Sequence, residues 1–104
     1  MKQKTEMMVS ETTRLAEGVW STTLTMPGGR LWGPVVPGQF VGVYPHDGSA
    51  LLPRPISICR ADSDSGAIRL VYRTVGNGTG ELSRSRPGER FNVLGFLGNG
   101  YNLE

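Results

Sequence analysis

The sequence has one cysteine, no long hydrophobic run and no block of like charges in its 104 residues. Cys59 cannot form an internal disulfide, and one thiol cannot hold a zinc ion or an iron-sulfur cluster by itself, so we expect a protein of the reducing cytoplasm. Polar residues follow Met1, which predicts no secretion signal. The lack of an apolar stretch of about 20 residues predicts no membrane-spanning helix.

Residues suited to hydrolytic chemistry are also few. His46 is the only histidine and has no partner at a diagnostic spacing. No obvious base accompanies Cys59 to activate its thiol. We therefore expect neither a catalytic residue of this kind nor a metal site.

Glycine and proline are abundant, with 15 and 7 residues that make up about a fifth of the chain. This is nearly twice their average usage, and it favours short strands joined by tight turns over a helical bundle. A chain of this length is expected to form one domain. The formal net charge of +2 indicates a modest preference for anions.

Six strands are predicted between turn residues, at 5–15, 19–26, 39–44, 54–60, 68–74 and 90–96. The strand at 68–74 is the clearest, because Ile68, Leu70 and Tyr72 alternate with polar or smaller residues at a period of two. Thr79 is placed to cap a short helix through Ser83, with Glu81 in its first turn. The pattern predicts an all-β fold, a six-stranded antiparallel Greek-key barrel with one short helix.

Arg54 is the first candidate for an anion ligand, because it lies between Pro53 and Pro55. A proline pushes the residue before it toward extended geometry, and a guanidinium on a stiff segment loses less entropy when it binds a phosphate with both nitrogens. The alternative is that Arg54 forms a surface ion pair and the prolines protect an edge strand.

A second candidate anion site is the segment 76–80, with sequence GNGTG. Its glycines can turn backbone amides toward a ligand, and the predicted helix follows at once. The spacing is not that of the dinucleotide fingerprint, and no Lys-Ser or Lys-Thr pair follows as in a P-loop. An ordinary loop is the alternative.

Tyr72 and Ser57 could join these two sites at one end of the barrel, where a nucleotide with a flat ring would match the set. Strand alternation puts Arg54 and Ile56 on one face and Ser57 on the other. Either a bulge intervenes or Ser57 acts partly through its backbone. The alternative for Tyr72 is that it only fills the core.

Taken together, four segments resemble the electron-transfer subunit of dihydroorotate dehydrogenase, in the ferredoxin-reductase-like flavoproteins. They are LLPRPISIC at 51–59, VYR at 71–73, GNGTGELS at 76–83 and LGFLGNGY at 94–101. The resemblance covers nearly all of the chain and implies an FAD-binding six-stranded barrel with a small helix. The sequence departs from the family at Phe96, where proline is usual, and at Pro53, where a charged or apolar residue is more familiar.

The resemblance also implies roles for nine residues. Two segments would line the FAD, namely Arg54, Pro55, Ile56 and Ser57 in one and Val71, Tyr72 and Arg73 in the other. Arg54 would lie near a phosphate, and Ser57 near the polar edge of the isoalloxazine ring, where it would tune the reactive nitrogen. Gly78 and Thr79 would present donors to the pyrophosphate.

The family's complete subunit passes electrons from dihydroorotate, oxidised at FMN in a partner subunit, through a [2Fe-2S] centre and FAD to NAD+. We expect residues 1–102 to be the FAD-binding domain and 103–104 to be a vector-derived tail. The nicotinamide-binding domain and the [2Fe-2S] segment are expected to be absent, so the chain alone is expected to be inactive.

Two other classes of function remain open. Close relatives use the same barrel in hydrogenase-linked, glutamate-synthase-linked and flavin-reductase systems. A small basic barrel could instead bind nucleic acid, but its aromatic residues are not interleaved with a basic stripe, as a stacking platform requires. We therefore expect neither a nucleic acid nor a membrane partner.

Overall fold

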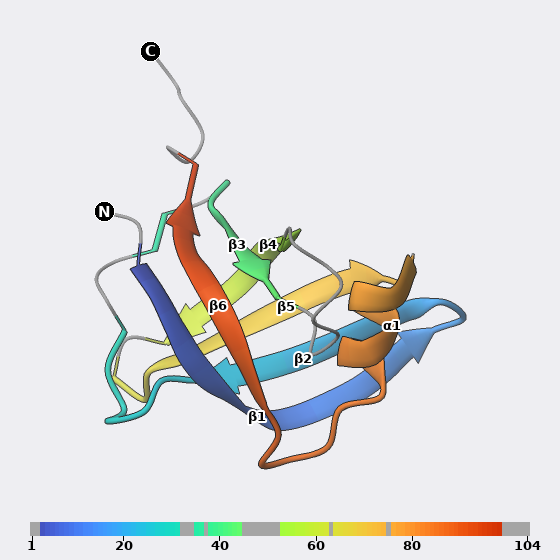
Figure 1. Cartoon of the computed structure of the whole chain (residues 1–104), viewed down its shortest axis with the longest axis horizontal. Coiled ribbons are helices and arrows are strands. Elements are labelled where there is room, and N and C mark those ends of the chain that lie inside the picture. Colours follow the sequence, from blue (N-terminus) through green and yellow to red (C-terminus); the bar gives the residue numbers. More distant parts are fainter. Residues whose placement is uncertain are drawn as a thin grey trace.

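The barrel predicted from the sequence is confirmed by a computed structural model, which describes residues 3–31, 35–36, 38–44, 53–62, 64–74 and 76–98. The elements in chain order are β1 (Gln3–Ala16), β2 (Val19–Thr25), β3 (Phe40–Val43), β4 (Arg54–Asp62), β5 (Ala67–Arg73), α1 (Gly76–Ser83) and β6 (Arg90–Leu97). The strands close into one barrel in the order β1-β2-β5-β4-β3-β6, and each neighbouring pair is antiparallel (Figure 1). The predicted turn at 45–49 and the tail at 103–104 lie outside the described residues.

The hairpin between β4 and β5 shows how turn chemistry fixes the strand register. One carboxylate oxygen of Asp62 accepts hydrogen bonds from the backbone N–H groups of Asp64 and Ser65. Gly66 then takes a φ of 71°, and a Cβ added there would lie 2.5 Å from the carbonyl carbon of Gly29. Glycine is required at this position both by its backbone conformation and by the close approach of the neighbouring turn.

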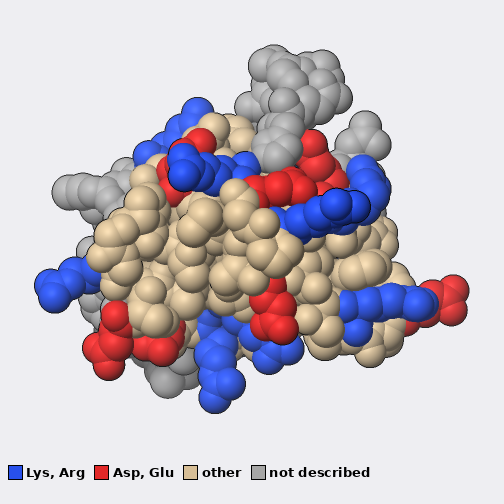
Figure 2. Space-filling model, turned by 90° about the horizontal axis from the view of Figure 1, so that it is seen from below, with Lys and Arg blue, Asp and Glu red and all other residues tan. Residues whose placement is uncertain are grey.

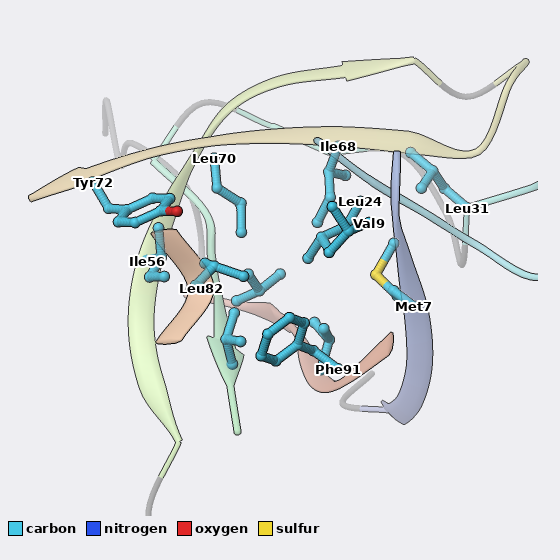
Figure 3. Close-up of a cluster of buried hydrophobic side chains, with 13 residues drawn as sticks. Met7, Val9, Leu24, Leu31, Ile56, Ile68, Leu70, Tyr72, Leu82 and Phe91 are labelled. Carbon is cyan, nitrogen blue, oxygen red and sulfur yellow. The ribbon is translucent and has the colours of Figure 1, made fainter. Parts of the chain in front are cut away.

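The core is built from inward-facing side chains of all six strands together with Leu31, which follows β2, and Leu82 of α1 (Figure 3). In β5 the predicted alternation is confirmed, because Ile68 and Leu70 are fully buried and Tyr72 is 7% exposed. Period-two burial on every side of a closed barrel leaves one continuous apolar interior.

The predicted start of the helix is wrong. α1 begins at Gly76, three residues before Thr79, and no acidic residue lies in its first turn, so Glu81 is further along than expected. Glycine disfavours helix by about 1 kcal/mol per residue relative to alanine. The helix nevertheless forms because Leu82 is fully buried in the barrel core and α1 packs on β1 and β2. Tertiary packing therefore overrides the local preference.

None of the helices in the described part of the chain is long and apolar enough to cross a membrane.

Candidate functional site

The barrel wall opens between β4 and β5. Their ladder runs from Asp62 and Ala67 to Ile58 and Leu70, and no pair beyond that point joins the described parts of the two strands. Each strand continues with a different neighbour, because residues 54–57 of β4 pair with β3 and residues 71–73 of β5 pair with β2. The two strand ends therefore diverge and leave a seam in the wall.

A groove of about 410 Å³ lies at this seam. Its lining residues are Arg54, Pro55, Ile56, Ser57, Val71, Tyr72 and Arg73. The volume falls within the range of small-molecule and cofactor sites, about 300–1,000 Å³. The structure thus brings seven of the nine predicted site residues to one place, from two segments that are more than ten positions apart in the chain.

Arg54 begins β4 opposite Val43 and is exposed to solvent. Among the described residues no carboxylate forms an ion pair with it, so the surface ion pair considered as its alternative is not found there. Pro55 lacks a backbone donor, but the β4–β5 ladder has already ended at Ile58 and no bond to β5 is lost. A Cβ on Gly42 would lie 2.9 Å from Pro53, so glycine there lets this proline pack against β3.

Ser57 reaches the groove without a bulge. The register of β3 with β4 is unbroken from Val43 opposite Arg54 to Phe40 opposite Ser57. The bulge that the structure does contain lies further along, between Ile58 and Arg60 in the pairing with β5. The bulge interpretation of Ser57 is therefore wrong, and the exposed Ser57 lines the groove because β4 has no partner on that side.

Tyr72 belongs to both the core and the groove, which unites the two alternatives considered for it. Its hydroxyl lies 2.7 Å from Oγ1 of Thr22 on β2. Burial raises the pKa of Tyr72 above its ordinary value of 10.0. Thr22 was not predicted, although its inward position between Trp20 and Leu24 follows from period-two alternation.

The raised pKa of Tyr72 predicts how stability depends on alkaline pH. Above pH 10 the unfolded chain loses the Tyr72 proton while the folded chain keeps it, so the folded state binds more protons and the free energy of unfolding falls as pH rises. We expect Tyr72→Phe to flatten this decline. Urea denaturation of both proteins from about pH 8 to about pH 11 measures it, and parallel curves would contradict it.

Gly78 and Thr79 lie in the first turn of α1, where the backbone is helical. The ordinary loop considered for this segment is therefore not found. The first four N–H groups of a helix have no partner within it, so the first turn of α1 has backbone donors that its own helix does not use.

Metal ligands do not gather in the described residues, since no group of three or more His, Cys, Asp or Glu side chains is placed to hold an ion. On the face shown in Figure 2, basic and acidic side chains of the described residues are mixed and form no basic stripe.

Solved structures place the barrel in the ferredoxin-reductase-like class of FAD-binding domains. The structure of an NADH-dependent reduced ferredoxin-NADP oxidoreductase, described for flavin-based electron bifurcation, matches with a TM-score of 0.79 and 27% identity over 92% of this chain and 34% of that chain. Phthalate dioxygenase reductase, described as a modular structure for electron transfer from pyridine nucleotides to [2Fe-2S], gives a TM-score of 0.71 and 20% identity over 86% and 28%.

Curated proteins are also similar to this chain in sequence. The electron transfer subunit of dihydroorotate dehydrogenase B (NAD+) from Listeria monocytogenes serotype 4a is 37% identical over 101 residues, which are 97% of this chain and 39% of the relative. No family model matches the chain. The chain is a homologue of these electron transfer subunits and spans about two fifths of their length, so the predicted resemblance is confirmed.

Proposed function

We propose that this chain is the FAD-binding barrel of a subunit that passes electrons between dihydroorotate dehydrogenase and NAD+ in pyrimidine biosynthesis, in the cytoplasm. The observation that carries the proposal is the seam between β4 and β5, which joins Arg54–Ser57 to Val71–Arg73 in a homologue of such subunits. The FMN-containing catalytic subunit is the proposed partner. The nicotinamide-binding domain and the [2Fe-2S] centre are proposed to lie in the part of the relatives that this chain does not span.

The groove fits a flavin in shape and in chemistry. Ile56 and Val71 supply apolar surface from the two sides of the seam, and the ring of Tyr72 lies within the same lining. Ser57 adds a hydroxyl, and Arg54 adds a guanidinium at the start of β4. A flat, partly apolar ring system that carries a phosphate matches this set of groups.

A bound flavin supplies the coupling of one-electron to two-electron transfer. In the proposed site the planar guanidinium of Arg54 binds two oxygens of one phosphate through two parallel hydrogen bonds. Ser57 donates a hydrogen bond to the polar edge of the ring, and the first-turn amides of α1, including those of Gly78 and Thr79, bind the pyrophosphate. The chain alone is proposed to bind FAD without catalysing the overall reaction.

A second candidate function is the FAD domain of another NAD(P)H-dependent reductase, such as a hydrogenase-linked or glutamate-synthase-linked system. The similarity to ferredoxin-linked and dioxygenase-linked reductases favours it, because those proteins share the barrel. The choice between the two candidates concerns the electron partner and leaves FAD binding unchanged.

The proposal is tested by titrating the purified protein with FAD while recording visible absorption and fluorescence, with FMN and a short oligonucleotide as competitors. Saturable binding of FAD that the oligonucleotide does not reverse is the expected result. Tight binding of the oligonucleotide without binding of FAD would contradict the proposal. Binding of neither ligand by folded protein would show that this barrel does not hold flavin by itself.

A further inference from the structure

Four side-chain hydroxyls, buried or partly buried, form a continuous hydrogen-bonded chain from Tyr72 to the end of α1. Tyr72 Oη lies 2.7 Å from Thr22 Oγ1, which lies 3.2 Å from Thr12 Oγ1. Thr12 Oγ1 lies 2.9 Å from Ser85 Oγ, which donates to the carbonyl oxygen of Leu82 at 2.6 Å. The chain therefore connects β5, β2, β1 and the last turn of α1.

The direction of the hydrogen bonds follows from the single proton of each hydroxyl. Ser85 uses its proton on the carbonyl of Leu82, so it can only accept from Thr12. Thr12 can then only accept from Thr22, and Thr22 can only accept from Tyr72. Burial raises the pKa of Tyr72, which keeps its phenol protonated at neutral pH and able to donate.

We propose that Thr22, Thr12 and Ser85 are positioning residues for the groove, because they hold Tyr72 with its hydroxyl proton directed into the barrel. In Figure 3 the hydroxyl oxygen of Tyr72 points toward the core cluster. A ligand in the groove therefore meets the ring of Tyr72, while the hydroxyl of Tyr72 lies on the buried side with Thr22. This arrangement favours an apolar surface of the ligand beside the ring of Tyr72 and offers no hydroxyl donor to a phosphate or carbonyl oxygen there.

The same chain ties the groove to α1. The last carbonyls of a helix have no partner within it, and that of Leu82 is satisfied by both the N–H and the hydroxyl of Ser85. The first-turn amides of α1 lie at its other end, so the chain fixes the ring of Tyr72 relative to a helix that is proposed to bind pyrophosphate. For a flavin, which rests on the proposed function, the ring of Tyr72 would offer a fixed aromatic surface for the cofactor to pack against.

The direction of the chain is tested on the ligand-free protein by infrared spectroscopy with isotope-labelled tyrosine, where Tyr72→Phe assigns the phenol C–O stretch of Tyr72. We expect this C–O stretch at the frequency of a phenol that donates a hydrogen bond. Thr22→Val, which removes the acceptor and keeps the shape, is expected to shift that band. The frequency of an accepting phenol, or a band that Thr22→Val leaves unmoved, would overturn the proposal.

The positioning role is tested by FAD affinity. Ser85→Ala is expected to weaken FAD binding about fivefold when Tyr72 is present and less than about twofold in the Tyr72→Phe background. Ser83→Ala is the matched control, since Ser83 is also buried but donates within α1 to Gly80. Equal effects of Ser85→Ala in both backgrounds would overturn the role. Failure of the parent protein to bind FAD would refute the proposed function instead, and the infrared band would still decide the direction.

Discussion

Arg54→Ala is expected to weaken FAD binding by about 1.5–3 kcal/mol, the usual effect of losing a hydrogen bond to a charged group. Arg54 lines the groove from the start of β4, and the described residues offer it no carboxylate that would compete with a phosphate. Its segment is stiffened by Pro55 and paired to β3, so little entropy is lost when the guanidinium binds. Isothermal calorimetry or fluorescence titration of the folded variant measures the change.

The control for this variant is Arg60→Ala. Arg60 is an exposed arginine on the same strand, but it lies past the bulge and does not line the groove at the seam. We expect its replacement to leave FAD affinity within about twofold, since it changes net charge alone and exposed charges are screened by salt. Arg54→Lys separates charge from geometry, because lysine keeps the charge and loses the planar fork. Equal affinities of Arg54→Ala and Arg60→Ala would show that Arg54 holds no phosphate.

Most of the fold is predictable because local chemistry and tertiary structure agree along the strands. The alternation of Ile68, Leu70 and Tyr72 predicts their burial, and Gly66 marks a turn that only glycine fits. The helix start is not predictable from propensity, because three glycines in α1 argue against a helix there. What stabilises it is the burial of Leu82, a contact that exists only once the barrel has closed.

The site is predictable in its members but not in its geometry. Motif and resemblance identify both strand segments, yet alternation alone puts Arg54 and Ser57 on opposite faces. Their convergence depends on where the β4–β5 ladder ends, at Ile58 and Leu70, and no local signal gives that point. The hydroxyl chain that ends at Tyr72 shows the same limit, since its members Thr12 and Ser85 are 73 positions apart in the sequence.

Leu82→Ala is expected to lower the free energy of unfolding by about 2–5 kcal/mol, a large part of the roughly 5–15 kcal/mol of a typical domain. Leu82 is fully buried and belongs to the barrel core, so its truncation leaves a cavity under α1. An eight-residue helix with three glycines has little stability by itself. We therefore expect α1 to lose order first, and FAD affinity to fall with the loss of its aligned first-turn amides.

Urea denaturation followed by the fluorescence of Trp20 and Trp32 measures the stability change, and FAD titration at low temperature, where the variant is still folded, measures the second effect. Leu15→Ala is the matched control, because Leu15 is 46% exposed on β1 and its truncation opens no cavity. Its unfolding midpoint and FAD affinity are expected to stay close to those of the parent protein. If Leu82→Ala were as stable as Leu15→Ala, the packing of α1 on the barrel would not be what holds the helix. If it were destabilised but bound FAD normally, the first turn of α1 would have no part in the pyrophosphate site, and the groove at the seam would hold the flavin without it.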